Sequence, residues 1–465
     1  MSDTVDLCVI GAGPAGLTAA ARAAEGGLDV LLLDEQPAPG GQVWRNAGSA
    51  QHDAGPAADA ALRRFAASGA DHRAGATLVD MTSPTSDSDT PTEITWRAPG
   101  TVTSPRIRRT VARAVVLATG AQERPLIFPG AELPGVMGVG AIQTAYKQSG
   151  LVPDAEAVVL AGHGPLMLLT LTQVRAAGGR VSALLDLGPP GGLARALKAL
   201  PRAVLGDTGM MAQGAGLLLR RMLSGVPVYR HVTRLRAHGA GHLQSVSFTS
   251  AGRTQHLPAR LLGVHDGVIP NTQVSRLLNL HHAWDAGQGA FVPVRDANGA
   301  VAPGLWIVGD GGGIGGVRVA ALEGEQAALS VLARAGRPDT HADHAGRLTR
   351  RRAARQLPEA LYPPIPLSAH ATDDALICRC EAVRVADVRA ALGTGIDGPN
   401  RVKALTRCGM GPCQGRLCGN PLTRLIADET GRTPDAVGAL RIRPPLKPVL
   451  LMDYLAPDAM PEAAS

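Results

Sequence analysis

Residues 5–24 read VDLCVIGAGPAGLTAAARAA and carry the strongest structural signal in the chain. The apolar run 6–10 precedes GAGPAG at 11–16, which matches G-x-G-x-x-G, and an Ala-rich segment continues from Leu17. This order predicts a β-strand, a tight glycine turn and an α-helix, the arrangement with which a dinucleotide-binding sheet begins.

The three glycines of this turn are expected to have separate roles. Gly11 allows a sharp turn, Gly13 allows a pyrophosphate to touch the backbone, and Gly16 allows the helix to pack closely on the strand. Pro14 and Ala15 then begin a helix whose N-terminus faces the anion. A glycine motif that stands alone is as often an ordinary turn as a cofactor site, so it needs support from the rest of the chain.

A carboxylate follows the next predicted strand. The run 29–33 ends at Asp34, where a side chain can accept hydrogen bonds from a ribose diol. Glu35 is the alternative residue for that role.

Three further stretches support a cofactor site. Gly-Gly-Gln occupies 40–42, Ala-Thr-Gly at 118–120 closes the apolar run 114–117, and a late strand, 305–308, ends in Gly309 and Asp310. In these features the chain resembles the two-dinucleotide-domain flavoproteins related to disulfide reductases. The resemblance implies FAD, with the Asp310 carboxylate on the ribityl chain, whereas the alternative for this stretch is a surface turn. The cofactor contacts it implies are Gly11, Gly13, Pro14, Ala15, Gly16, Asp34, Glu35, Gly41, Gln42, Trp44, Arg45, Ala118, Thr119, Gly120, Gly309 and Asp310.

Length and composition agree with a globular α/β protein. The 465 residues are enough for about three domains, and 45% of them are hydrophobic. We expect two Rossmann-like domains, the second inserted in the first, and a small helical C-terminal domain. The predicted boundaries are 1–150 with 262–335 for the FAD-binding domain, 151–261 for the inserted domain, 336–374 for an extended linker, 375–445 for the C-terminal domain and 446–465 for a tail.

Charge and hydropathy exclude other classes of protein. The net charge of +7 is modest, and the basic run 347–355 has no aromatic residues within it, so a solvated or partner-facing surface is favoured over a nucleic-acid site. The sequence shows no transmembrane segment, since no apolar run reaches the roughly 18 residues that a membrane span needs. The N-terminus enters its first strand without a basic segment or cleavage site, which predicts a cytoplasmic protein, peripheral to a membrane at most through its complex.

A second glycine turn lies within the inserted domain. Gly162-His163-Gly164-Pro165-Leu166-Met167 follows an apolar strand, but Met167 stands where a third small residue is expected. Asp186 ends the next strand and could hold a ribose. The alternatives are NAD, another adenine nucleotide, or a domain that has lost its ligand. His265, later in the chain, could face the flavin or be a hydrogen-bonded histidine at a strand end.

Five of the six cysteines lie between residues 378 and 418. Their distribution does not suit a disulfide framework and predicts a metal site instead. Clustered thiolates select zinc or iron with sulfide, and a C-x-C pair over a tight turn favours the second. Zinc is the alternative.

The cysteine stretch closely resembles the bacterioferritin-associated-ferredoxin-like 2Fe-2S domain. The resemblance implies Cys378, Cys380, Cys413 and Cys418 as ligands, and Cys408 is expected to point elsewhere. Nearby arginines at 379, 407 and 416 would offset the negative charge of such a cluster. Asn420 and Pro421 are expected to begin a helix that ends near Gly431.

The combination of cofactors points to electron transfer. A flavin exchanges two electrons, whereas a 2Fe-2S cluster passes one at a time. Cys8 is the only cysteine before Cys378, so no redox-active thiol pair can lie near the flavin, and no pair of catalytic acid and base residues is apparent.

Nearly the whole chain, in this order of parts, resembles the α subunits of heteromeric flavin-dependent amine and amino-acid dehydrogenases, such as those that oxidise opines, glycine, proline or hydroxyproline. The resemblance implies a β flavoprotein partner that oxidises a C–N bond, in some complexes a small third subunit, and a downstream electron acceptor. The alternatives are a self-sufficient NAD(P)H-dependent reductase and a non-catalytic scaffold.

Overall fold

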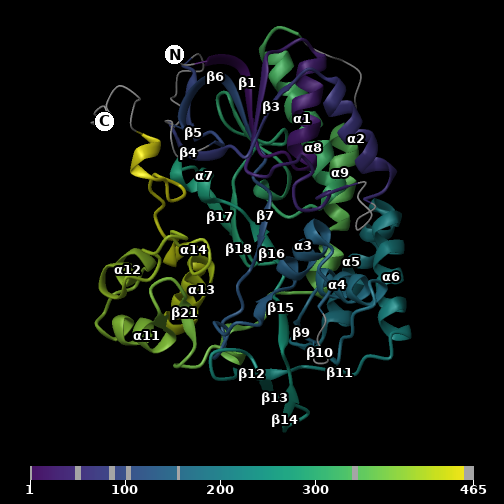
Figure 1. Cartoon of the computed structure of the whole chain (residues 1–465), viewed down its shortest axis with the longest axis vertical. Helices are drawn as coiled ribbons and strands as arrows, with labels where there is room; N and C mark the ends of the chain where they lie inside the picture. Colours follow the sequence, from purple (N-terminus) through teal and green to yellow (C-terminus); the bar gives the residue numbers. More distant parts are fainter. Residues whose placement is uncertain are drawn as a thin grey trace, which may run out of the picture.

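The computed structural model describes residues 3–47, 54–82, 90–100, 106–153, 158–337 and 344–454. Its first unit is an eight-stranded sheet in which β19-β20-β6-β1-β2-β3 form the main order and β4 and β5 pair beside β6 (Figure 1). Strand β1 (Asp3–Ile10) pairs in parallel with β2 (Val30–Asp34) and β6 (Ile107–Leu117), so the carboxyl ends of these strands meet at one edge. The remaining strands are β3 (Asp71–Ala74), β4 (Thr77–Met81), β5 (Thr92–Arg97), β19 (Ala300–Ala302) and β20 (Leu305–Ile307).

Helices α1 (Pro14–Glu25) and α8 (Val317–Arg334) pack together on one face of this sheet. Alternation along β1 sends Leu7 and Val9 to their side and Cys8 to the opposite side. The two helices approach closely, because a Cβ at Gly324 would lie 2.1 Å from the carbonyl oxygen of Ala15. Both helix N-termini therefore lie at the edge where β1, β2 and β20 end.

The inserted unit has its own five-stranded parallel sheet in the order β11-β10-β9-β15-β8. Its strands are β8 (Val136–Gly138), β9 (Val158–Gly162), β10 (Ala183–Asp186), β11 (Val228–Tyr229) and β15 (Leu261–His265). This sheet begins before residue 151 and continues past residue 261, so the unit is larger than predicted. The reason is that the short strand β8 pairs with β15 rather than with the first sheet, which is visible only in three dimensions.

Helices and a second small sheet cover the inserted sheet. Met167 and Leu171 of α4 (Pro165–Ala176) are buried against it, and α3 (Val139–Ser149) lies beside them. The antiparallel strands β12 (Thr233–His238), β13 (Ser245–Ser250) and β14 (Arg253–Pro258) pack on the other side.

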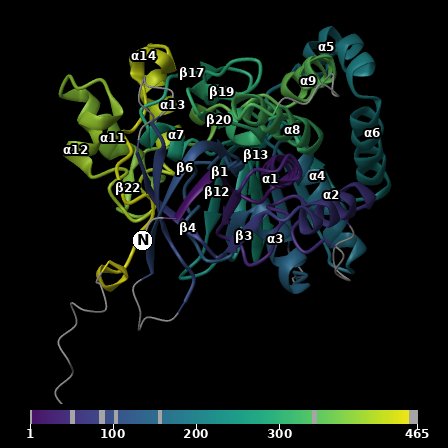
Figure 2. The same cartoon turned by 90° about the horizontal axis from the view of Figure 1, so that it is seen from above.

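Two long helices, α5 (Gly192–Gly206) and α6 (Thr208–Leu223), lie on the side of the molecule away from the C-terminal domain (Figures 1 and 2). They expose several large apolar side chains, among them Leu193, Leu205 and Leu223. Among the described residues, no helix combines the length and the apolar character that a bilayer crossing requires.

The stretch 336–374 differs from the extended linker that its prolines predict. It contains α9 (His344–Ala354) and α10 (Gln356–Leu361), and Pro358 sits in the first turn of α10, where a missing N–H breaks no helical bond. Part of the basic run also faces inward, because Arg352 Nη2 donates to Glu323 Oε1 at 2.7 Å. Tertiary ion pairing therefore orders a segment whose composition suggested a solvated connection.

The C-terminal domain consists of a two-stranded ribbon and four helices around a buried apolar core. Its elements are β21 (Leu376–Cys378), β22 (Val383–Arg384), α11 (Val385–Gly393), α12 (Pro399–Thr406), α13 (Gly419–Thr430) and α14 (Pro434–Val437). Helix α13 ends at Gly431 in the left-handed conformation, as predicted.

The chain then returns to the first unit. Leu446 N–H donates to Val79 O at 2.8 Å, and Arg106 Nε donates to Asp453 Oδ1 at 2.6 Å. The predicted tail is thus packed on the first sheet as far as it is described, whereas the segment that enters the C-terminal domain contacts the inserted unit, where Arg236 pairs with Asp374. The α/β fold class with a C-terminal domain is confirmed.

Candidate functional site

The glycine turn after β1 fits a bound dinucleotide. Gly11 has φ +104°, and a Cβ there would lie 2.5 Å from Ala118 O, while a Cβ at Gly16 would lie 1.8 Å from Gly11 O. These two glycines are explained by the turn and by packing. Gly13 differs, because its φ is −76° and a Cβ there would meet no atom within 4 Å. Glycine at this position leaves open space beside the helix N-terminus, as a pyrophosphate requires.

A second loop lies against this turn. A Cβ at Gly41 would lie 2.8 Å from Gly13 Cα, and Gly40 N–H donates to Ala12 O at 2.8 Å. Trp44 is buried and closes the loop by donating its N–H to Gly40 O at 3.1 Å. The two glycine-rich segments that the sequence singles out are therefore brought into contact.

Two cations lie at this loop. Arg45 is buried, and its Nη1 donates to Gln36 Oε1 at 2.8 Å. Lys147, from α3 of the inserted unit, is also buried, and its Nζ donates to the carbonyl oxygens of Gln42 and Val43 at 3.3 and 3.1 Å. Burial, and then the charge of Arg45, lowers the pKa of Lys147 to about 8. Sequence reasoning missed Lys147, because nothing in a helix of another unit signals contact with this loop.

The carboxylates of Asp34 and Glu35 have different partners in the structure. Asp34 is buried, its carboxylate accepts from Ala12 N–H, and its Oδ1 accepts from Gln36 N–H at 2.7 Å. Burial raises the pKa of this carboxyl, although these hydrogen bonds oppose the shift. Glu35 instead pairs with Lys447 of the returning chain. Asp34 is the carboxylate that adjoins the glycine turn.

The turn 118–120 and the Gly-Asp turn also meet. Gly311 lies in the 3₁₀ turn Gly309–Gly312, and a Cβ there would lie 2.9 Å from Thr119 Oγ1. Asp310 Oδ1 accepts from the N–H groups of Gly315 and Gly316, each at 2.9 Å. This places the carboxylate at the N-terminal end of α8, where the flavoprotein resemblance implies the ribityl chain.

The second glycine turn is filled by protein. His163 Nδ1 lies 3.0 Å from Asp186 Oδ1 and its Nε2 lies 3.2 Å from Leu361 O, while the ring of Tyr362 packs edge-on against it at 5.0 Å. Burial opposes ionisation of Asp186, but hydrogen bonds from His163 and Gly188 outweigh it and lower the pKa of that carboxyl.

These contacts do not fit a second dinucleotide. The carboxylate that would hold a ribose is already paired, and the end of α10 lies against the turn. His265, the other histidine in question, is buried with its Nδ1 2.7 Å from Glu123 Oε1, which is the hydrogen-bonded alternative for that residue.

The C-terminal domain brings its cysteines together. The Sγ atoms of Cys378, Cys408 and Cys418 lie within 4.8 Å of one another, and all three residues are buried. Hydrogen bonds from the thiols of Cys408 and Cys418, and then from the N–H groups of Gly409 and Glu381, lower the pKa of Cys378 to about 2 despite its burial. Donors converging on thiolate sulfur are what a metal–sulfur centre needs.

Cys380 and Cys413 complete the group. Cys380 is exposed and hydrogen-bonds with the backbone N–H and the side chain of Cys413. A Cβ at Gly411 would lie 2.2 Å from Cys380 Cβ, so a glycine there lets the two loops converge. The expectation that Cys408 points elsewhere is wrong, because tertiary packing turns it inward with Cys378 and Cys418. The four-residue ligand set remains a prediction.

The thiol loop is attached directly to the first unit. Gln122 Nε2, in β7 (Ala121–Glu123), donates to Arg416 O at 2.8 Å. Asn420 Nδ2 donates to Gly289 O at 2.8 Å. Because Gln122 follows Gly120 by two residues, the predicted flavin loop and the cysteine loop are neighbours.

Comparison with known proteins agrees with this architecture. Residues 5–324 match the family described as pyridine nucleotide-disulphide oxidoreductase, and residues 373–458 match the sarcosine oxidase A3 domain. An opine oxidase subunit of Rhizobium meliloti (strain 1021) is 41% identical over 96% of this chain and 97% of that protein. Hydrogen cyanide synthase subunit HcnB of Pseudomonas aeruginosa is 31% identical over 95% of this chain and 96% of that protein. The crystal structure of L-proline dehydrogenase from P. horikoshii shares the fold, with a TM-score of 0.73, 19% identity, and coverage of 97% of this chain and 79% of that one.

Proposed function

Because this chain belongs to the pyridine nucleotide-disulphide oxidoreductase family and to the group that includes this opine oxidase subunit, we propose that it is the electron-transfer subunit of a heteromeric amine or amino-acid dehydrogenase. The chain is an oxidoreductase. In the proposed complex, a β flavoprotein removes a hydride and a proton across a C–N bond, which leaves an imine, and this chain receives the two electrons.

The observation that carries the proposal is the adjacency of two candidate cofactor sites of different redox chemistry. The open space at Gly13 fits the pyrophosphate of FAD, and the five thiols fit an iron–sulfur centre. When bound, FAD would supply two-electron chemistry and a 2Fe-2S cluster single-electron transfer. The hydrogen bond between Gln122 and Arg416 O connects the loop of the predicted flavin site to the cysteine loop.

The residues around each site would do the binding. Gly11, Gly13 and Gly16 shape the turn, Asp34 faces the position of a ribose, and Lys147 with Arg45 would offset the charge of a pyrophosphate. Asp310 would hold the ribityl chain. Cys378, Cys380, Cys413 and Cys418 are the proposed cluster ligands.

The occupied second turn argues against a self-sufficient NAD(P)H-dependent reductase. His163 and Asp186 satisfy each other, so a nicotinamide nucleotide would first have to break that pair. We therefore propose that the inserted unit binds neither NAD nor another adenine nucleotide and that electrons enter from the partner.

The test is a comparison of the isolated chain with its native complex, using substrate-dependent reduction of a dye. The isolated chain, loaded with both cofactors, should show little or no activity with amines and amino acids, and the complex should show full turnover. A control complex with Cys378→Ser should lose dye reduction at the cluster while substrate still bleaches the partner's flavin. Equal rates for the isolated chain and the complex would contradict the proposal, and full turnover without the cluster would favour the scaffold alternative.

A further inference from the structure

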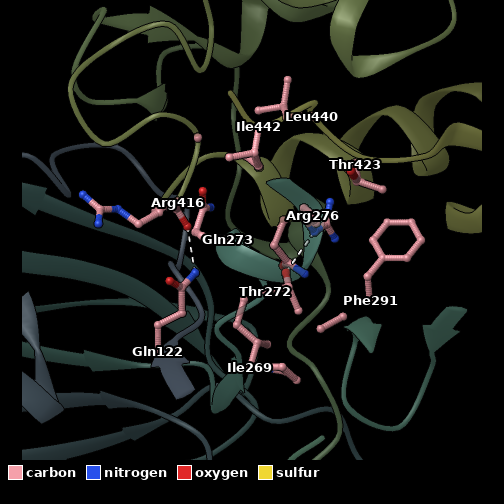
Figure 3. A pocket seen from close by; sticks show the side chains of 15 residues that line it. Gln122, Ile269, Thr272, Gln273, Arg276, Phe291, Arg416, Thr423, Leu440 and Ile442 are labelled. Atoms are coloured by element: carbon pink, nitrogen blue, oxygen red, sulfur yellow. Dashed lines mark hydrogen bonds between the residues drawn. The ribbon is translucent and has the colours of Figure 1, made fainter. Parts of the chain in front are cut away.

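A cavity lies at the junction between the first unit and the C-terminal domain (Figure 3). Its walls come from β16 (Val268–Pro270), α7 (Gln273–Leu277) and the loop that carries Cys418. The residues that matter for its chemistry are Gln273, Arg276, Phe291 and Asn420. Its free volume is about 50 Å³. Since one water needs about 10–15 Å³ by the same measure, the cavity has room for a small organic ion and excludes a nucleotide.

Arg276 contributes a positive charge to this cavity. Its Nε donates to Thr272 Oγ1 at 2.9 Å, and its guanidinium carbon lies 4.9 Å from the centre of the Phe291 ring (Figure 3). Both partners are neutral. Within the described part of the chain, no carboxylate oxygen lies within 4.0 Å of an Arg276 nitrogen. Arg276 is partly buried, and a charge that is partly removed from water without a counter-ion is costly, so an anion bound in the cavity would stabilise it.

The surroundings of Arg276 confirm that its charge is not offset by the protein. Burial alone lowers the pKa of Arg276 to about 10, so the group stays protonated at neutral pH. The charge of Arg276 also affects His282: burial, and then this charge, lowers the pKa of His282 to about 4. Ser275 Oγ lies 2.9 Å from Nε2 of His282.

Two acceptors lining the same cavity also lack partners. Gln273 Oε1 and Asn420 Oδ1 are buried and, among the described residues, receive no hydrogen bond. The orientation of the Asn420 amide is fixed, because its nitrogen donates to the carbonyl of Gly289. Buried amide oxygens call for N–H or O–H donors.

We propose that this cavity binds a small carboxylate that also carries an amino or hydroxyl group, such as glycine or glycolate. The planar guanidinium of Arg276 matches a carboxylate with two parallel hydrogen bonds. The ammonium group of glycine donates to both Gln273 and Asn420, whereas the single O–H of glycolate donates to Gln273. This site goes beyond the proposed electron-transfer function, because it needs neither cofactor nor the partner subunit, and its occupant would bridge the first unit and the cysteine loop.

The experiment is a titration of the full chain with glycine, glycolate, acetate and inorganic phosphate, followed by calorimetry and by the thermal unfolding midpoint. Glycine and glycolate should bind and raise the midpoint. Acetate should bind at least about tenfold more weakly, because it leaves both amide oxygens unpaired. Arg276→Gln should abolish binding of all three carboxylates. Arg236→Gln is the matched control, since Arg236 forms an exposed ion pair with Asp374 away from the cavity.

Variants of the cavity separate a binding defect from a folding defect. Without ligand, Arg276→Gln should unfold at the same temperature as the wild type or above it, because a partly buried charge without a counter-ion is removed. Gln273→Met should weaken glycolate and leave acetate unchanged. The proposal is overturned if no carboxylate binds the wild type, if Arg276→Gln still binds glycolate, if acetate binds as tightly as glycolate, or if phosphate binds more tightly than either.

Discussion

Gly13 is the residue at which FAD binding can be tested without disturbing the fold. A side chain there meets no protein atom within 4 Å and needs no unusual backbone angle, so Gly13→Val should fold normally. The new methyl groups would occupy the space of the pyrophosphate, and the affinity for FAD should fall by more than about a hundredfold. The flavin absorbance of the purified variant and calorimetric titration with FAD measure this loss of affinity. Gly16→Val is the contrasting variant and should fail to fold, since its Cβ would overlap Gly11 O. Stoichiometric FAD in Gly13→Val would show the site assignment to be wrong.

The cysteines can also be separated residue by residue. Serine at Cys378, Cys380, Cys413 or Cys418 should abolish the 2Fe-2S absorbance and the EPR signal of the reduced state. Cys408→Ser should keep the cluster and shift its potential, because the Cys408 thiol donates to the Cys378 sulfur. FAD content is the control and should not change. Loss of the cluster in Cys408→Ser together with its survival in Cys413→Ser would replace Cys413 by Cys408 in the ligand set.

Lys147 gives the stability of the protein a pH dependence of known sign. Its pKa is about 8 in the folded chain and about 10.4 in an unfolded one, so between these values the unfolded state binds more protons. Stability contributed by this group therefore rises with pH through that window. In FAD-free protein, we compare the unfolding midpoint of the wild type with that of Lys147→Gln. The difference, wild type minus variant, should increase from about pH 7.5 to about pH 9.5. Parallel curves for the two proteins would show that Lys147 has an ordinary pKa.

At the scale of elements, the end of α10 and the turn after β9 act as one structural unit. His163 links Asp186 to Leu361 O, and its removal leaves a partly exposed carboxylate with fewer donors. His163→Ala should lower the free energy of unfolding by about 0.5–1.5 kcal/mol, measured with denaturant, because solvent screens the partly exposed carboxylate. FAD content should stay the same, and NADH should leave the flavin of both proteins oxidised. Bleaching of the wild-type flavin by NADH would show that this turn opens to a nucleotide.

At the scale of the whole molecule, the returning chain couples the C-terminal domain to the first sheet. Leu446 packs in the core of that sheet, and Asp453 is buried beside Arg106. Removing residues 446–465 should split thermal unfolding into two transitions, because the C-terminal domain then keeps only its linker and a few direct hydrogen bonds to the first unit. Scanning calorimetry measures this, and truncation after residue 454 is the control. A single transition at the wild-type temperature would mean that the tail adds nothing to cooperativity.

The features that the sequence predicts well are those whose cause is local. Gly11, Gly13 and Gly16 lie within one turn, and C-x-C with the later cysteines lies within one domain, so the pattern alone indicates each. The helices of the supposed linker depend on ion pairs with distant residues such as Glu323. Lys147, Arg276 and the inward position of Cys408 depend on which elements meet. The periodicity and spacing of residues in one sequence do not show which elements contact each other in the fold.

The hydrogen bonds between Gln122 and Arg416 O and between Asn420 and Gly289 O join neutral groups. A diffusing ferredoxin must meet its reductase, and the rate of that meeting depends on concentration and on ionic strength. Here the two sites of the proposed transfer lie in one chain, and the two hydrogen bonds between them are not screened by salt. Electron passage between them would follow first-order kinetics, with the same half-time in dilute and in concentrated solution and from low to high salt.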